Sequence, residues 1–295
     1  MLKLYSIKFS NDEADIPLLY WKGPKKGSPV FHWAHATGFN GETYKSLLQL
    51  MSTKFHVYAW DLRGHGRSKA NTLKIKNEQI YETYVRDLSS LISWLSKKHE
   101  SKILVGGHSI GGTISISAAS RNLESVKSLL LVDPVIFPWY VKYFMAAARY
   151  LKLPIPNAYL SSNAKKRKYD WPDIDTLINS YEGRGAFKTW HKPFLINYLK
   201  AGTIKNKDNL LLSCHPSWES RNFKAFDSVN IIDTIYQLRL PIRLLVAEWG
   251  STTKALSTFR KNQNCTIKVV KQSTHFIPME NPSLVQTELF NLSDE

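Results

Sequence analysis

The segment Gly107-His108-Ser109-Ile110-Gly111 has the residue types most suited to chemistry in this sequence. It follows an apolar run, 102–106, that predicts a β-strand, and a helical pattern comes directly after it. A serine at such a sharp strand-to-helix turn has a strained backbone conformation, which small glycine neighbours permit. The turn presents the hydroxyl at a helix N-terminus, where the helix dipole and free N–H groups stabilise negative charge. The pattern predicts that Ser109 is a nucleophile.

His275 is the candidate for the base that such a serine needs. It lies in Ser273-Thr274-His275-Phe276, just beyond the last predicted strand, 266–270. An imidazole has an unperturbed pKa of about 6.5, so at neutral pH it can take a proton from a hydroxyl and return it to a leaving group. The sequence therefore predicts nucleophilic catalysis by a serine with a histidine as general base.

Two further segments each follow a predicted strand. They are His35-Ala36-Thr37-Gly38-Phe39, after 30–34, and 61–68, after 55–60. Together with the segments around Ser109 and His275, and in this order, they make the chain resemble the α/β-hydrolase superfamily, the fold of lipases and esterases, over nearly its whole length. The resemblance implies an α/β fold with a mostly parallel eight-stranded sheet flanked by helices, an inserted and mainly helical cap, and a triad in the chain order Ser, acid, His.

The acid of this triad has two candidates. The superfamily usually places it after the strand 242–246, in a segment of the form G-x-x-D, but in this chain Gly250 stands where the aspartate would be. Glu248, in the same segment, is one alternative. The other is Asp133, which directly follows the strand 128–132, a position that some relatives use. Because the carboxylate must hold the imidazole from a fixed position at a strand end, we favour Asp133.

The oxyanion hole is expected to combine two backbone N–H groups. The resemblance implies that one comes from Ile110, after the nucleophile, and the other from the loop that begins at His35. The superfamily's pattern in this loop is His-Gly-x, and here Ala36 replaces the glycine. We expect Thr37 to supply the second N–H and His35 to brace the loop through a hydrogen bond.

Several other residues of these segments are expected to be structural. Arg63, Gly64 and Gly66 resemble the structural turn of the superfamily, and His65 is expected to belong to the scaffold. His108 is also a scaffold candidate, although its place beside Ser109 makes it a candidate for the substrate pocket as well.

Short apolar runs alternate with helical patterns from 30 to 132, which indicates a parallel sheet covered on both faces. The apolar spacing from 81 to 95 predicts an amphipathic helix, and a last helix is expected to begin near Pro282. Residues 1–29 are expected to add two opening strands. The predicted strands of the remaining chain are 30–34, 55–60, 102–106, 128–132, 242–246 and 266–270.

The strand and helix alternation stops after Pro134 and resumes at 242, so an insertion is expected between them. We assign 1–134 and 236–295 to the α/β-hydrolase core and 135–235 to a cap. The cap is rich in aromatic residues, which suit the wall of an apolar pocket. The candidate pocket residues are Phe39, His108, Trp139, Tyr140 and Trp218.

One segment of the expected cap resembles a motif without a known role. Cys214-His215-Pro216-Ser217-Trp218-Glu219 is similar to a Cys-Pro-Pro-x-Trp-Glu segment of uncharacterised superfamily members. The similarity brings no activity with it.

The net charge of +16 raises the question of an anionic partner. The densest basic cluster, 165–168, has no aromatic stacking motif or zinc-finger spacing around it, so we expect a solvated face and no nucleic-acid partner. Contact of this cluster with an anionic membrane surface is the alternative. Cys214 and Cys265 form no C-x-x-C pair, and we expect neither a disulfide nor a metal site. With no long apolar segment, the protein is expected to be cytoplasmic.

These features predict an esterase that acts on a small carboxylic ester through an acyl-enzyme and requires no cofactor. A serine at the elbow argues against the relatives that use an aspartate there. Cleavage of a carbon–carbon bond or a thioester by the same triad is the alternative, and a catalytically inactive member that binds a ligand or partner is a candidate of another class. The sequence does not predict an oligomeric state.

Overall fold

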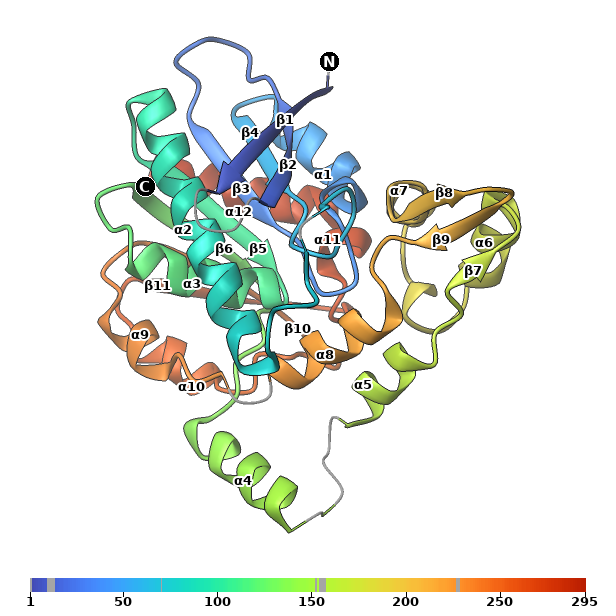
Figure 1. Ribbon diagram of the computed structural model, residues 1–295. Helices are drawn as coiled ribbons and strands as arrows, with labels where there is room; N and C mark the ends of the chain where they lie inside the picture. Colours follow the sequence, from blue (N-terminus) through green and yellow to red (C-terminus); the bar gives the residue numbers. More distant parts are fainter. Residues whose placement is uncertain (1, 10–13, 70, 152, 154–157, 227–228) are drawn as a thin grey trace.

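The protein is built on an eight-stranded sheet of order β1-β2-β4-β3-β5-β6-β10-β11 (Figure 1). The computed structural model describes residues 2–9, 14–69, 71–151, 153, 158–226 and 229–295. Strand β2 is antiparallel to both of its neighbours, and the other neighbouring pairs are parallel. The strands are β1 (Leu2–Phe9), β2 (Ala14–Trp21), β3 (Val30–Ala34), β4 (His56–Trp60), β5 (Ile103–His108), β6 (Val126–Val132), β10 (Ile242–Ala247) and β11 (Cys265–Val270). Every predicted strand is confirmed, including the two opening ones.

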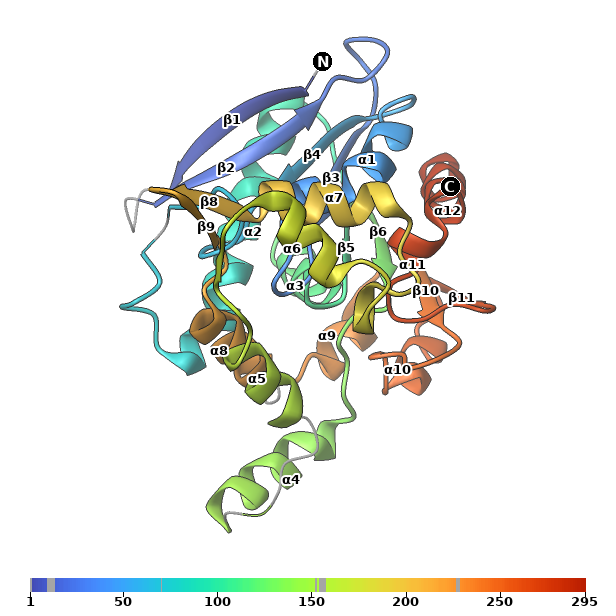
Figure 2. The same cartoon turned by 90° about the vertical axis from the view of Figure 1, so that its right-hand side faces the viewer.

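Helices cover both faces of this sheet (Figures 1 and 2). One apolar layer holds α2 (Ile80–His99), α3 (Ile110–Ser120), α9 (Ile232–Gln237) and α10 (Leu256–Arg260). The other holds α1 (Lys45–Met51), α11 (Ile277–Glu280) and α12 (Pro282–Asp294). Strand β3 shows how the sequence divides between them, since Val30 and Ala34 face the first layer while Phe31 and Trp33 face the second. The expected α/β architecture is confirmed.

The two predicted helices, α2 and α12, are both present, and residues at their ends explain where they stop or start. The apolar stripe of α2 is buried from Tyr84 to Leu95, and the helix ends at Glu100, which has a left-handed φ of 49°. Helix α12 begins at Pro282, and the Asn281 side chain accepts a hydrogen bond from the N–H of Leu284. Proline at the first helical position and an asparagine cap before it are strong helix starts.

A long segment between β6 and β10 corresponds to the expected insertion. It contains the helices α4 (Trp139–Tyr150), α5 (Ala158–Lys165), α6 (Ile174–Tyr181), α7 (Lys192–Ala201) and α8 (Pro216–Phe226). The expected end of the cap at residue 235 falls within α9, which contacts α3 and α10 of the core.

The segment also contains a small sheet that the sequence analysis did not predict. Its strands are β7 (Asp170–Trp171), β8 (Thr203–Asn206) and β9 (Asn209–Leu212), and both pairings are antiparallel. The hairpin between β8 and β9 turns at Lys207 and Asp208, which carry no glycine or asparagine turn signal. Four-residue strands with an ordinary turn sequence leave little periodicity to detect.

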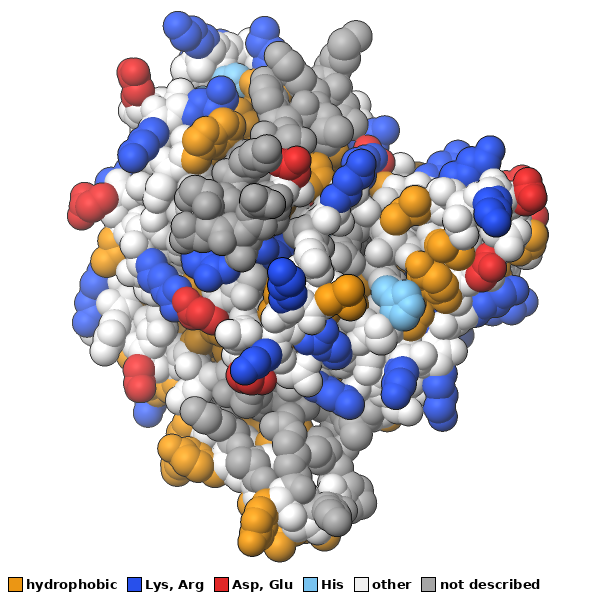
Figure 3. Space-filling view, in the orientation of Figure 1, with side chains coloured by type: hydrophobic (Ala, Val, Ile, Leu, Met, Phe, Trp, Pro, Cys, Tyr) orange, Lys and Arg blue, Asp and Glu red, His pale blue; other side chains and the backbone are white. Residues whose placement is uncertain are grey.

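Helix α4 projects from the body of the molecule (Figures 1 and 2). Its aromatic side chains at positions 139, 140, 143 and 144 are all more than half exposed. The Lys and Arg side chains are spread over the face shown in Figure 3. Among the described helices, none combines the length and apolar character needed to cross a membrane.

Candidate active site

Ser109 lies at the turn between β5 and α3, as predicted. Its backbone has φ 58° and ψ −127°, a conformation that residues other than glycine rarely adopt. A Cβ atom on Gly107 would lie 2.5 Å from the carbonyl carbon of Gly111, and a Cβ on Gly111 would collide with the carbonyl oxygen of Ala34. Only glycines allow the strand, the turn and the loop after β3 to pack this closely.

This packing brings the two expected oxyanion donors to the same end of the sheet. The loop after β3 touches the first turn of α3, where Ile110 is the first residue. Within the described residues, no hydrogen bond engages the backbone N–H of Ile110 or of Thr37. Two unengaged N–H groups at the end of the sheet that carries the serine are suited to an oxyanion.

The structure brings His275 and Asp133 into direct contact. The distance between Nδ1 of His275 and Oδ2 of Asp133 is 2.6 Å, and the Asp133 side chain is fully buried. Because Nδ1–H donates to the carboxylate, Nε2 is left to accept a proton. No hydrogen bond joins Ser109 Oγ to the His275 ring among the described residues, and such bonds often tighten only when substrate binds.

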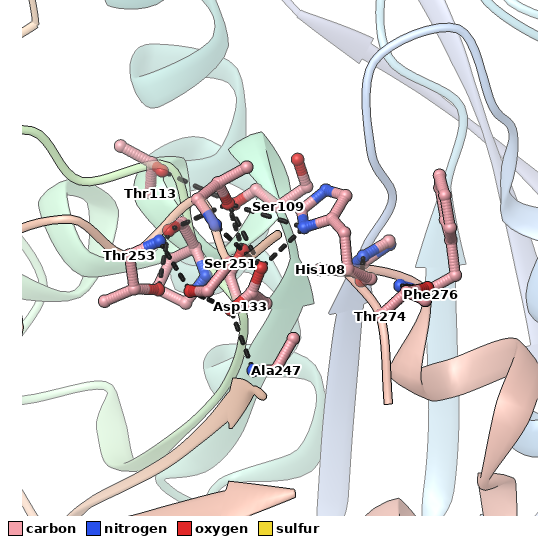
Figure 4. A network of polar contacts seen from close by, with 12 residues as sticks. His108, Ser109, Thr113, Asp133, Ala247, Ser251, Thr253, Thr274 and Phe276 are labelled. Carbon is pink, nitrogen blue, oxygen red and sulfur yellow. Dashed lines mark hydrogen bonds and ion pairs between the residues drawn. The ribbon is translucent and has the colours of Figure 1, made fainter. Parts of the chain in front are cut away.

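Asp133 sits in a cradle of hydrogen-bond donors at the end of β6 (Figure 4). Its Oδ1 accepts from the Ser251 hydroxyl at 2.6 Å and from the N–H of Ala247 at 3.1 Å, and its Oδ2 accepts from the N–H of Thr252 at 2.9 Å. Burial alone would raise the pKa of Asp133, but His275 and these donors hold it below its ordinary value. The carboxylate is therefore charged at neutral pH, as the orienting acid of a triad must be.

Like Ser109, Asp133 has a positive φ at the end of its strand. Its φ is 43°, and its backbone N–H donates to the carbonyl of Leu245 on the neighbouring strand. Strained conformations of this kind persist where the surrounding hydrogen bonds over-determine them. Ser251 and Thr252 were not among the predicted site residues, although two hydroxyl residues directly after Gly250, where the aspartate is missing, are a signal that points to them.

The alternative acid, Glu248, is elsewhere in the structure. Its carboxylate pairs with Lys271 at 2.8 Å and accepts a hydrogen bond from the N–H of Gln272. The hydrogen bond from Lys271 is the main reason that the pKa of Glu248 is lowered. The described contacts of Glu248 do not include His275.

A chain of hydrogen bonds runs behind the site from the loop after β3 to the loop of His275. The N–H of Ala36 donates to the hydroxyl of Tyr44, which lies 2.8 Å from Nδ1 of His108. Nε2 of His108 donates to the carbonyl of His275 at 2.8 Å. Burial lowers the pKa of His108 to about 3, so the ring is neutral and Nδ1 can accept. His108 thus positions the backbone of His275.

His35 and His65 belong to the scaffold, as expected. His35 donates from Nδ1 to the carbonyl of Ala36 and accepts from the N–H of Leu62 at 2.9 Å, which braces the loop after β3. Burial lowers the pKa of His35 to about 4 and that of His65 to about 3. Both rings are therefore neutral.

Four of the five candidate pocket residues are either buried in the body of the protein or exposed on α4. His108 has no exposed surface, and Trp218 lies beneath the turn at Gly64, where its Nε1 donates to the carbonyl of Arg63. Trp139 and Tyr140 are exposed on the projecting helix α4. The assignment of these residues to the pocket wall stays a prediction, because an aromatic residue type indicates burial or contact but not which wall the side chain joins.

Phe39 remains a candidate for the pocket wall. Its ring lies 5.2 Å from that of Trp190, 5.1 Å from that of Tyr198 and 6.3 Å from that of Phe276, which follows His275. It thus connects residues of the inserted segment with the loop of the proposed base. In the part of the chain that the structure describes, no group of three His, Cys, Asp or Glu side chains is placed to hold a metal ion.

A family model described as serine aminopeptidase, S33, matches residues 26–176, just over half of the chain. The chain belongs to this family of α/β hydrolases. The matched residues include Ser109 and Asp133, whereas His275 lies beyond them.

Comparisons with individual proteins agree with the family. Rat (Rattus norvegicus) monoglyceride lipase is 29% identical over 170 residues, which cover 54% of this chain and 55% of that protein. Protein phosphatase methylesterase 1 of Kluyveromyces lactis is 24% identical over 270 residues, which cover 86% of this chain and 64% of the relative. The chain spans 35% to 55% of the length of the first curated relatives that it matches.

The fold of the whole chain also has a counterpart among solved structures. The crystal structure of E-2-(acetamidomethylene)succinate hydrolase superposes with a TM-score of 0.74 at 17% identity, and the match covers 100% of both chains. At this identity the likeness concerns the fold alone. It confirms that the α/β-hydrolase fold extends over the full length of this protein.

Proposed function

We propose that this protein is a serine hydrolase that cleaves small carboxylic esters with the triad Ser109, Asp133 and His275. The observation that carries the proposal is the 2.6 Å hydrogen bond between His275 and the buried Asp133. A neutral imidazole held by a charged, buried carboxylate is the pair that activates a serine. The strained conformation of Ser109 and the unengaged N–H groups beside it support the same chemistry.

In the first half-reaction, Ser109 Oγ attacks the ester carbonyl carbon while Nε2 of His275 takes the hydroxyl proton. The carbonyl oxygen becomes an oxyanion, which the N–H groups of Ile110 and Thr37 stabilise. The C–O bond to the alcohol then breaks, and His275 gives its proton to the departing alkoxide. Asp133 stabilises the imidazolium between these two steps and is not itself protonated.

In the second half-reaction, water replaces the alcohol. The water oxygen attacks the acyl carbon while Nε2 of His275 takes a proton from the water. The oxyanion forms again and is stabilised by the same two N–H groups. The bond from the acyl carbon to Oγ then breaks, and the proton held by His275 returns to Ser109. The products are a carboxylic acid and an alcohol, and the protein ends in its starting state.

The names of two relatives, a monoglyceride lipase and a methylesterase, support an ester as the substrate class. The proposal includes a cap, assigned to residues 135–235, above the site. The contacts of Trp190 and Tyr198 with Phe39 support a cap that approaches the loop of the oxyanion donors.

Labelling with a fluorophosphonate probe tests the proposed nucleophile directly. We expect stoichiometric labelling of the folded wild type and none of Ser109→Ala, because the probe reacts with an activated serine. A series of p-nitrophenyl esters of increasing acyl length then measures the pocket. Absence of labelling in the folded wild type would support the inactive member of the fold, whereas labelling with preferred turnover of thioesters or of carbon–carbon bonds would replace the ester substrate.

A further inference from the structure

The segment from Cys214 to Glu219 acquires a role in the structure. It leads into α8, and Trp218 anchors that helix to the core by donating from Nε1 to the carbonyl of Arg63 at 2.9 Å. The neighbouring residue, Glu219, is thereby directed toward the loop after β3. Its side chain is 10% exposed.

The carboxylate of Glu219 lies directly against Gly38. A Cβ atom on Gly38 would collide with Oε1 of Glu219 and would lie 3.0 Å from its carboxyl carbon. Gly38 has a left-handed φ of 77°, so glycine is favoured here both by conformation and by contact. Because Gly38 directly follows Thr37, the contact with Glu219 restrains the loop beside the proposed oxyanion donor.

Arg167 holds this carboxylate from the other side. Its Nη1 lies 2.8 Å from Oε2 of Glu219, its Nε donates to the hydroxyl of Tyr181 at 2.8 Å, and its Nη2 donates to the hydroxyl of Tyr198. The Arg167 side chain is 16% exposed. A guanidinium with three partners is a rigid support, since its donors have a fixed planar geometry.

A second connection runs from Arg167 to the far end of the same loop. The main-chain carbonyl of Tyr198 accepts a hydrogen bond from Nδ2 of Asn40 at 3.0 Å, and the Tyr198 ring packs on Phe39. The loop that carries Thr37 is therefore contacted at Gly38 through Glu219 and at Phe39 and Asn40 through Tyr198. Arg167 joins both contacts.

The charges of Glu219 and Arg167 should affect the reaction in opposite ways. A buried carboxylate beside the oxyanion hole would destabilise a developing oxyanion, because like charges repel strongly where water is excluded. The guanidinium of Arg167 offsets that repulsion. Loss of the cation alone should therefore harm the reaction more than loss of both charges.

We propose that the Arg167–Glu219 ion pair is a positioning unit for the oxyanion loop, 35–40. Glu219 fixes the turn at Gly38, and Arg167 both orients the carboxylate and cancels its charge near the forming oxyanion. The inference rests on the proposed function, since it concerns the same oxyanion hole. Neither residue is required to touch the substrate.

A double-mutant cycle on ester hydrolysis tests this role. For Arg167→Gln we expect kcat to fall by at least about tenfold with little change in KM, since removal of an oxyanion donor itself costs about 10² to 10³ in kcat. The double variant Arg167→Gln with Glu219→Gln should recover part of this loss. All values are expressed per site labelled by fluorophosphonate, so that unfolded protein does not contribute.

Matched variants separate positioning from stability. Arg243→Gln breaks a comparably buried pair with Glu288, 12% and 5% exposed, away from the oxyanion loop, and should leave kcat unchanged. Arg167→Lys keeps the cation and should retain a higher kcat than Arg167→Gln. The lysine variant also tests the proposal if the glutamine variant does not fold.

The inference is overturned if Arg167→Gln retains wild-type kcat per labelled site, if the Glu219→Gln change restores nothing, or if Arg167→Lys is no better than Arg167→Gln. Failure of the proposed function gives a different result, namely a folded wild type that is not labelled, and it removes this inference as well.

Discussion

Asp133 and Glu248 both follow parallel strands of the same sheet, β6 and β10, yet their surroundings differ completely. Asp133 is fully buried and accepts hydrogen bonds from an imidazole, a hydroxyl and two backbone N–H groups. Glu248 is 26% exposed and pairs with Lys271, which is itself 79% exposed. Two strand-end carboxylates of equal formal charge are thus suited to very different work.

The difference shows that the loop after β10 does not carry the proposed acid but does donate the hydrogen bonds that fix it. Its loop carries Gly250 where the superfamily usually has an aspartate, and the next two residues, Ser251 and Thr252, donate to Asp133 instead. A carboxylate orients an imidazole only if donors fix it and burial keeps water away. The loop provides both for the neighbouring strand.

The largest expected effect comes from Asp133→Asn. The amide keeps the shape of the side chain but cannot hold the same imidazole tautomer, and by analogy with a serine-protease triad we expect kcat to fall by about 10⁴. The measurement is kcat for a p-nitrophenyl ester, with Ser109→Ala as the lower limit.

Glu248→Gln is the matched control for that experiment. It removes one carboxylate from the end of the adjacent parallel strand, and we expect kcat to stay within about twofold of the wild type because exposed ion pairs contribute little. A large loss here together with a small loss in Asp133→Asn would reverse the assignment of the acid.

The next largest effect on kcat is expected when an aspartate is placed at position 250, where the superfamily usually has its acid. Gly250 has φ 65°, which aspartate tolerates better than most residues, and a Cβ atom there would meet no atom within 4 Å. In an Asp133→Asn background, Gly250→Asp should raise kcat by about tenfold or more. Loss of the triad acid lowers kcat by about 10⁴, and the new carboxylate should restore part of that loss. If Gly250→Ala raised kcat equally, the recovery would not come from the carboxylate.

The sequence predicted the fold and most of the candidate site because these depend on local signals. Alternating apolar runs located the strands, and glycines at 107 and 111 marked the turn at Ser109. Asp133 could be favoured over Glu248 because it directly follows the predicted strand 128–132, at a position that some relatives use. The donors of Asp133 and the contact between Glu219 and Gly38 depend on residues more than 100 positions apart, and no local pattern brings those together. The walls of a pocket depend on the same kind of long-range packing, and the candidate pocket residues stay predictions.

Ser251→Ala should show a smaller effect on the same acid. It removes the 2.6 Å hydrogen bond to Oδ1 of Asp133 but leaves the N–H groups of Ala247 and Thr252 in place. We expect a loss of about 2 kcal/mol in the free energy of unfolding, typical of a hydrogen bond to a charged group, and a decrease of several-fold in kcat. Urea unfolding and ester hydrolysis measure the two quantities. An unchanged kcat would show that the backbone donors suffice to fix the carboxylate.

The smallest expected effect is on stability in acid. The pKa of Asp133 is lowered in the folded protein, because His275 and the surrounding donors outweigh burial. Its charged form therefore stabilises the fold above the unfolded pKa of about 3.9, and this contribution is lost as the pH falls through the lower, folded value. The difference in free energy of unfolding between the wild type and Asp133→Asn should narrow as the pH falls below about pH 4, as measured by urea unfolding. Among the described residues, the Glu248 carboxylate is bound by an exposed lysine and one N–H, so Glu248→Gln should show a weaker dependence. Equal curves for the two variants would remove the distinction between the two strand ends.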